Sequence, residues 1–403
     1  MGMNGILRTL VCSTVVLSAT AAWSIEFHGR SSTQLQWFNN YFDNKKQVEI
    51  GQYLSASITK IDDAGKFTIE GYGRMTQDIR NDEGFQGRVY YLYANYRDLF
   101  NMVDVRLGRQ YVNYSAGSAL IDGAKIDVKN IGPVALSVMG GRNITYNLYN
   151  ESTHAGDYAV GVSAYLYNMK DTDLEISWYH KLVKDDVAQD ILGASFKQYL
   201  FNQLKLYGNT RYDLASEVFG ELLAGVSYFP LDNLIFTAEW YQSYPMFDAT
   251  SIYSVFAVNR YQEGVIKADY RINKMFSVNA GYTRQDYEEG ASDVFEVGVG
   301  IRPLDTLRMN LNYDYISGYD GKRNGANVDV EYEALKDLKV AAGFQYNVDK
   351  YDALTGEVIG RSYWGGATYQ LNKTMSMNAR IENNVNSFYK EDWRGRVAFN
   401  IDF

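Results

Sequence analysis

Apolar and polar side chains alternate one by one along most of this sequence. The last segment shows the pattern best, because every second residue from Trp393 to Phe403 belongs to one face and the arginines and amides between them to the other. The same alternation recurs at 204–213, 307–315 and 338–347. Alternation over about ten residues, apolar outward and polar inward, is the pattern of a strand that crosses a membrane. In residues 86–97 (QGRVYYLYANYR) the pattern does not reveal which parity would face lipid.

Short turn signals separate these segments in pairs, at intervals of about 30 to 40 residues. Ten of them predict eleven hairpins and about 22 strands, within a range of 16 to 22. Pro133, Pro230 and Pro303 fall in such turns, where a missing N–H harms no strand ladder. Longer polar connections are predicted between the turns, at Asn39–Lys46, Asp78–Gly84, Asn143–Asp157, Ser243–Asn259, Gly318–Gly325 and Asp349–Glu357.

Residues 1–24 read as a cleaved signal peptide. Arg8 supplies positive charge, Leu10 to Leu17 form a short apolar run, and Ala22 and Ser24 are small residues before a cut at Ile25. The apolar run is shorter than the roughly 20 residues that a spanning helix needs. We therefore expect export to the periplasm, followed by assembly of residues 25–403 into the outer membrane.

Composition agrees with strands that have one apolar and one wet face. The chain has 35 Tyr, 35 Gly and only 4 Pro, with a mean hydropathy of −0.32. A large soluble all-β protein is the alternative, but it would show more Pro and fewer outward aromatics.

The formal net charge of −9 argues against a nucleic-acid partner. The single Cys12 lies in the leader, so no haem-attachment motif, Cys-ligated metal or other cofactor is expected.

An unpaired strand edge would leave backbone donors and acceptors bare in hydrocarbon, at several kcal/mol for each group. The sheet must therefore close on itself. We predict an all-β fold: one closed antiparallel transmembrane β-barrel with short periplasmic turns and longer extracellular loops. Because the first strand begins near Glu26, directly after the cut, we expect no plug domain.

The chain resembles the Gram-negative outer-membrane porin superfamily. Its C-terminal RGRVAFNIDF is similar to the signal that the barrel-assembly machinery reads, here Phe399, Ile401 and Phe403. Residues 105–128 resemble a porin strand that ends in Gly108-Arg109-Gln110, a glycine-rich loop, and a next strand that opens at Asp122-Gly123. In typical trimeric porins the third loop is long and folds into the pore. Here that stretch, Tyr111 to Leu120, is short, which argues against a strong inward constriction and against a trimer.

The predicted lumen carries charges of both signs, which implies a wet, weakly selective interior or ion pairs that brace the wall. The positive candidates are Arg30, Arg74, Arg106, Lys125, Lys205, Arg211, Lys267, Arg308, Lys339, Arg380, Arg394 and Arg396. The negative candidates are Glu26, Glu49, Glu70, Asp127, Glu175, Glu239, Asp269, Glu296, Asp314, Asp329, Glu331 and Glu382.

Two functions stay open. The first is a channel for passive diffusion of small hydrophilic solutes or ions. The second, by resemblance, is a scaffold barrel that sheaths a multihaem cytochrome in an extracellular electron-transfer conduit. Expected partners are outer-membrane lipid and the barrel-assembly machinery, with a homo-oligomer or periplasmic and extracellular cytochromes as alternatives. An enzyme is not expected, because His28, His154 and His180 stand in no catalytic motif.

Overall fold

The computed structural model describes residues 25–41, 45–146, 151–166, 169–244, 260–319, 321–350, 356–387 and 391–403. The predicted leader lies outside these residues. Twenty-two strands form one antiparallel sheet. They are β1 (Glu26–Asn40), β2 (Lys45–Thr59), β3 (Phe67–Asp78), β4 (Gln86–Leu99), β5 (Val103–Tyr114), β6 (Gly117–Ile131), β7 (Val134–Asn143), β8 (Tyr158–Leu166), β9 (Thr172–Val183), β10 (Asp186–Leu200), β11 (Leu204–Asp213), β12 (Val218–Leu231), β13 (Leu234–Ser243), β14 (Tyr261–Arg271), β15 (Phe276–Tyr287), β16 (Gly290–Leu304), β17 (Leu307–Gly318), β18 (Gly321–Leu335), β19 (Leu338–Lys350), β20 (Val358–Gln370), β21 (Met375–Val385) and β22 (Asp392–Asp402).

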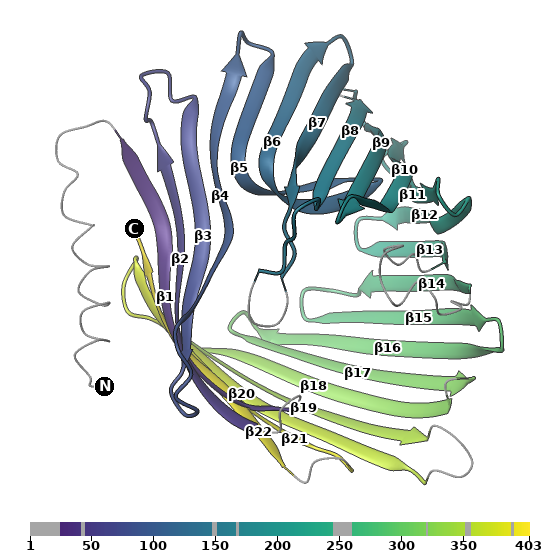
Figure 1. Cartoon of the computed structure of the whole chain (residues 1–403). Helices are drawn as coiled ribbons and strands as arrows, with labels where there is room; N and C mark the ends of the chain where they lie inside the picture. The colour runs from purple at the N-terminus through teal and green to yellow at the C-terminus, as the bar shows by residue number, and fades with distance from the viewer. Residues whose placement is uncertain are drawn as a thin grey trace.

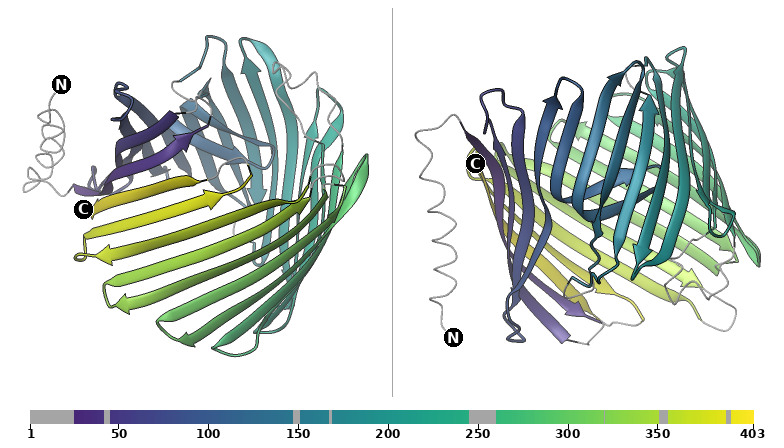
Figure 2. Two further views of the ribbon diagram at one scale, coloured as in Figure 1. Left: turned by 90° about the horizontal axis from the view of Figure 1, so that it is seen from below. Right: turned by 45° about the horizontal axis from the view of Figure 1, so that its top comes forward.

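The sheet is closed, as predicted. Each strand pairs with its neighbours in sequence, and β22 pairs with β1 from Arg30↔Asp402 to Trp37↔Gly395. Gly29 and Phe403 extend this seam, since the N–H of each donates to the carbonyl of the other at 2.9 and 3.0 Å. The strands therefore form a continuous wall that curves around a hollow interior (Figures 1 and 2).

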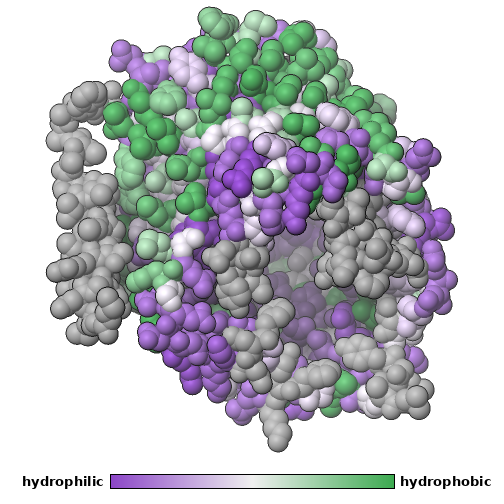
Figure 3. All heavy atoms as spheres, in the orientation of Figure 1, coloured by the Kyte–Doolittle hydropathy of each residue, from purple (hydrophilic) through white to green (hydrophobic). Residues whose placement is uncertain are grey.

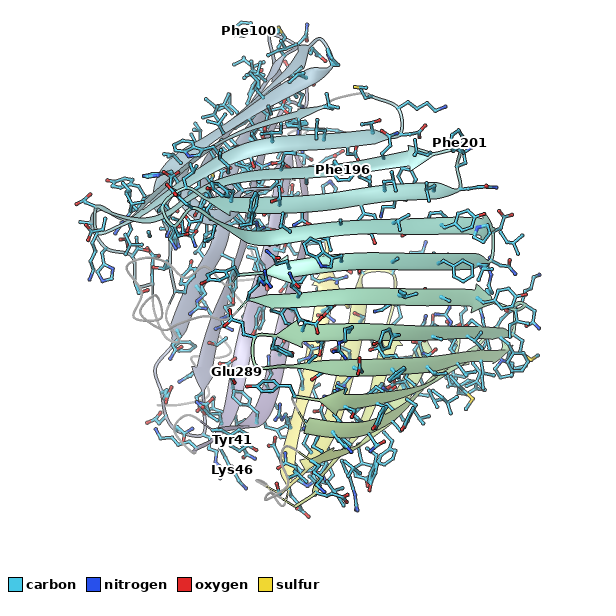
Figure 4. All side chains as sticks on the ribbon, turned by 90° about the vertical axis from the view of Figure 1, so that its right-hand side faces the viewer. Tyr41, Lys46, Phe100, Phe196, Phe201 and Glu289 are labelled. Carbon is cyan, nitrogen blue, oxygen red and sulfur yellow. The ribbon has the colours of Figure 1, made fainter. Side chains whose placement is uncertain are left out.

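Connections at one end of the barrel, which we call the short-turn rim, join β2 to β3, β4 to β5 and so on to β20–β21. The opposite end, the long-loop rim, carries β1–β2 through β21–β22. Phe201 and Glu289 mark the two rims in Figure 4. The predicted connection Gly318–Gly325 was wrong: β17 runs to Gly318 and β18 begins at Gly321, so most of that polar stretch is strand.

The two faces of the wall differ in polarity. On β7, Leu136 and Val138 are exposed on one face, while Ser137 is buried on the other. Figure 3 shows hydrophobic residues on the outer surface at the top and hydrophilic ones around the central hollow. In the described part of the chain, no helix has the length and apolar character that a membrane crossing requires.

A β-bulge explains why residues 86–97 gave no clear parity. Tyr72 pairs with Tyr91 but Gly73 pairs with Val89, so Tyr90 is an extra residue on β4. Tyr90 stacks on Tyr72 at 4.9 Å between ring centroids, while Val89 and Leu92 are exposed on the apolar face. The alternation therefore shifts by one in the middle of the strand.

Apolar side chains also form a collar at the short-turn rim. Phe100 and Phe201 are 84% and 89% exposed at their turns (Figure 4). Other exposed apolar residues lie at or beside seven more of the ten turns, giving a collar made of Phe100, Ile131, Met169, Phe201, Leu231, Ile272, Leu304, Leu335 and Leu371. The collar is thus a band of exposed apolar side chains at this end of the barrel.

Candidate pore constriction

The outer half of the β5–β6 hairpin leaves the barrel wall. Pairing between β4 and β5 ends at Leu92↔Arg109, and pairing between β6 and β7 ends at Ile121↔Asn143. Beyond these points β5 and β6 pair with each other up to Tyr114↔Gly117, and the Ile144 N–H donates to the Leu120 carbonyl oxygen at 2.7 Å. We call residues 110–121 the inner hairpin, because its contacts lie on the inner face of the wall. Figure 1 shows the ends of β5 and β6 turning beneath β7 to β9.

Two facing glycines allow this departure. Gly108 has φ +123°, a left-handed conformation, and it pairs with Gly123. A Cβ atom on Gly108 would lie 2.4 Å from the carbonyl oxygen of Leu92, and one on Gly123 would lie 2.2 Å from that of Gly140. The backbones of the neighbouring strands thus approach too closely for any side chain at the bend.

The tip of the inner hairpin is held to the wall by hydrogen bonds from three strands. The Ala116 N–H donates to Ser177 Oγ at 2.8 Å, and the Ser115 N–H donates to Glu175 Oε1 at 2.9 Å. From β11, Arg211 Nε donates to the Ser115 carbonyl oxygen at 3.0 Å. On β7, the hydroxyls of Tyr114 and Ser137 lie 2.7 Å apart. Three of the four polar backbone groups of the two-residue tip are therefore satisfied by the wall.

Apolar packing accompanies these bonds. Val112, Tyr114, Ala116, Ala119 and Ile121 of the inner hairpin are buried together with four wall residues, namely Met139, Ala159, Tyr179 and Ile191. The fit is close at Gly193, where a Cβ atom would lie 2.2 Å from the Ala116 nitrogen. Among the described residues this is the one contiguous buried apolar cluster, and it lies inside the barrel, between the hairpin and the wall.

An arginine anchors the base of the inner hairpin. Arg109 donates to both carboxylate oxygens of Asp122, at 2.8 and 2.7 Å, on the facing strand. It also contacts Glu151 at 3.0 Å and donates to the Tyr146 hydroxyl at 2.9 Å. A two-pronged guanidinium–carboxylate pair fixes orientation as well as distance, so the base is held where the hairpin bends.

The prediction that the stretch from Tyr111 to Leu120 does not fold strongly inward is therefore wrong. A short loop does not prevent an inward element, because that element is the pair of strands itself, closed by a two-residue turn. Two features of the sequence point to it in retrospect. The stretch from Gln110 to Ile121 contains no charged residue, and it lies between Gly108 and Gly123.

The structure does not gather the predicted lumenal charges into one site. Ten of the 24 stand in these ion pairs on the wall: Lys125 with Asp127 at 2.6 Å, Arg211 with Glu221 at 3.2 Å, Lys267 with Glu296 at 3.8 Å, Asp314 with Arg323 at 3.2 Å, Arg30 with Asp402 at 2.6 Å, Arg380 with Glu382 at 3.4 Å and Arg394 with Asp392 at 2.6 Å. Others contact aromatic rings, with Arg74 over Tyr90, Arg106 over Tyr93 and Lys205 over Tyr207, whose hydroxyl donates to Glu239. Arg308 lies on β17 and Arg396 lies on β22.

The predicted assembly residues lie on β22 and at its end. Phe399 and Ile401 alternate with the polar Asn400, and Phe403 stacks on Phe27 of β1 at 5.1 Å between ring centroids. Their role as a signal for the assembly machinery stays a prediction.

The three histidines lie apart from one another. His28 contacts Glu26 at 3.5 Å, His154 contacts Asp157 at 3.5 Å, and His180 contacts Asp190 at 3.7 Å. Among the described residues, no group of three or more His, Cys, Asp or Glu is placed to hold a metal ion.

Known structures share this fold at low sequence identity. Two mutant forms of the ferric enterobactin receptor PfeA from Pseudomonas aeruginosa match 94% of this chain and 80% of their own, at 11% identity and TM-scores of 0.64 and 0.62. OccAB1 from Acinetobacter baumannii matches 94% of this chain and 96% of its own, at 12% identity and a TM-score of 0.46. No family model and no curated protein sequence matches the chain. The comparison with the PfeA structures confirms the predicted β-barrel fold.

Proposed function

We propose that this protein is an outer-membrane channel through which small hydrophilic solutes diffuse passively, and that the inner hairpin narrows its lumen. The observation that carries the proposal is a closed wall with a polar inner face, across part of which a strand pair is fastened. A barrel of this size encloses a wide lumen, so an element inside it is needed to limit the size of the solutes that pass.

The membrane setting is supported by the outer surface. Exposed apolar side chains cover the outer face, and the collar at the short-turn rim continues them to the ends of the strands. We place the short-turn rim in the periplasm and the long-loop rim outside the cell, as is usual for outer-membrane barrels. The assembly machinery would then meet β22 and Phe403 on the periplasmic side.

The inner hairpin also weighs against the sheath alternative. A cytochrome enclosed by the barrel would need the space that the hairpin and its buried cluster occupy beside β7 to β11. No observation on the described residues favours a protein guest, so we propose the channel alone. Whether the barrels associate into homo-oligomers is a separate property that the proposal does not require.

Planar-bilayer recording tests the proposal. Purified protein should give steady single-channel currents with weak ion selectivity, because charges of both signs line the wall and several are in ion pairs. Poly(ethylene glycol) molecules of increasing size should stop lowering the current at a size below the width of an unobstructed barrel. Protein that is folded, as judged by a gel mobility that changes on heating, yet conducts no ions would refute the channel.

A further inference from the structure

Two adjoining recesses open on the inner face where β21 and β22 meet β1 and β2. Their volumes are about 480 and 540 Å³, within the range of small-molecule sites. Both are lined by Gln36 and Arg396, so these two side chains stand at the junction. We call the two together the seam recess.

Positive charge is in surplus at the seam recess. Four arginines line it, and three of them have carboxylate partners: Arg30 with Asp402, Arg380 with Glu382 and Arg394 with Asp392. For Arg396, the described residues provide no acidic side chain within ion-pair distance. One exposed guanidinium is thus left over at the junction.

The strand register makes this surplus costly. Arg380 lies directly opposite Arg396 on the neighbouring strand, and like charges in that position repel. On the other side Arg396 faces Gln36, and the next residue in the row is Glu49. Glu49 is two strands from Arg396, roughly 10 Å between backbones, and no ion pair joins these two described residues. A bound anion would relieve the repulsion between the two arginines.

Neutral polar groups continue from Arg396 along β1. Gln36 Nε2 donates to Gln34 Oε1 at 3.2 Å, and Gln34 Nε2 donates to Ser32 Oγ at 3.0 Å. Tyr53 and Asn378 line the same recess. Each amide and hydroxyl retains further donor or acceptor positions. This row can therefore donate hydrogen bonds to the hydroxyl groups of a solute or accept hydrogen bonds from them.

We propose that the seam recess binds a small solute that has one carboxylate and several hydroxyl groups, as a sugar acid does. The carboxylate lies on Arg396, with Arg380 beside it, and the hydroxyls lie along Gln36, Gln34 and Ser32. This proposal rests on the proposed channel function for the route by which the solute arrives, and it names the class of solute that the channel would favour.

Equilibrium binding measured by calorimetry on the detergent-solubilised protein tests the site without any need for conduction. The probes are gluconate, sorbitol (its uncharged counterpart) and hexanoate (an anion without hydroxyls). We expect the protein to bind gluconate more tightly than either of the others. In Arg396→Gln, gluconate affinity should fall about tenfold or more, to the level of sorbitol, because a charge-assisted hydrogen bond is lost.

Arg80→Gln is the matched control, since it removes the same charge from the β3–β4 connection and should leave gluconate affinity unchanged. The gluconate affinity of Arg396→Lys should lie between that of the parent protein and that of Arg396→Gln, because lysine keeps the charge but lacks the fork of donors. Circular dichroism and heat-modifiable mobility report whether each variant is folded. Gluconate that binds no tighter than sorbitol, or an unchanged affinity in Arg396→Gln, would overturn the site. Gluconate binding by a barrel that conducts no ions would retain the site and reject the channel.

Discussion

At the scale of the residue, Phe403 contributes to closure directly. Its backbone exchanges two hydrogen bonds with Gly29, and its ring stacks on Phe27 with an interplanar angle of 13°. The next pair along the seam is Arg30 with Asp402, joined by bonds of 2.6 and 2.9 Å. The last residues therefore fasten the end of the chain to its first strand, apart from any part they have in assembly.

Replacing Phe403 with Ala should weaken the seam even when no assembly machinery is present. The stacked pair should be worth about 1 kcal/mol, and the refolding midpoint in urea should shift accordingly. Refolding into detergent micelles, followed by unheated gel electrophoresis, measures this. Phe403→Tyr keeps the ring and should refold as the parent does. Equal midpoints for Phe403→Ala and the parent would restrict the residue to an assembly role.

Asp157 links two connections at the long-loop rim. It accepts the backbone N–H of His154 at 2.6 Å and that of Lys184 at 2.9 Å. Burial alone would raise the pKa of this carboxyl, but the two N–H donors outweigh burial and hold the pKa below its usual value. The stabilisation is therefore present above the unfolded pKa of about 3.9 and is lost as the pH falls through the lower folded pKa.

Amide hydrogen exchange at Lys184, corrected for the intrinsic effect of pH, should follow that sign. Protection should hold from neutral pH down to about 4 and then decline. In Asp157→Asn one acceptor oxygen is lost, so protection should be about tenfold lower at neutral pH and should no longer change across the acid range. Glu217→Gln, an exposed acid of the β11–β12 turn, is the control. Acid-independent protection in the parent protein would contradict the assignment.

At the scale of the element, the inner hairpin combines strand pairing with tertiary contacts. Its two strands remain regular, while its tip contacts Glu175, Ser177 and Arg211, which follow it by 60, 61 and 96 positions in sequence. The two faces of the hairpin differ. Buried residues face the wall, whereas Tyr111, Asn113 and Ser118 are exposed to the interior.

A disulfide can test where the tip lies. The hydroxyl oxygens of Ser115 and Ser177 are 2.7 Å apart, which suits the short Cβ separation that a disulfide needs. Because the only natural cysteine is Cys12, residues 25–403 supply no competing thiol. The double variant S115C/S177C should form the bond on mild oxidation, as a free-thiol assay would record. S115C/S32C, which places the second thiol on β1, should keep both thiols free. Free thiols in S115C/S177C, or a disulfide in S115C/S32C, would contradict the placement of the hairpin tip beside β9.

The sequence predicted the strands better than it predicted the hairpin. Alternation and turn signals depend on neighbours in sequence, so they gave 22 strands and a closing partner for Phe403. The inward bend depends on the positive φ of Gly108, and on contacts with Ser177 and Arg211 that no local pattern encodes. The extra Tyr90 hid the parity of β4 for a similar reason, because a single bulge inverts the alternation.

At the scale of the whole molecule, the wall is regular and its interior is not uniform. The side at β7 to β11 is covered by a hairpin that carries no charge between Gln110 and Ile121. The seam between β21 and β2 is bare, lined by arginines and amides. We infer that the hairpin limits the size of the solutes that pass, and that the seam recess favours solutes with a carboxylate and hydroxyl groups.

Single-channel conductance of a hairpin-shortened variant tests this account most directly. Tyr111 and Leu120 face each other across the hairpin, so residues 112–119 can be replaced by Asn-Gly, which forms a tight two-residue turn. Arg109 and Asp122 are kept, so the base of the hairpin remains anchored. Conductance should rise about twofold or more, and larger poly(ethylene glycol) molecules should enter, because a barrel of 22 strands has a wide lumen when nothing narrows it. Equal conductance and equal size exclusion in the parent and the shortened protein would contradict the account.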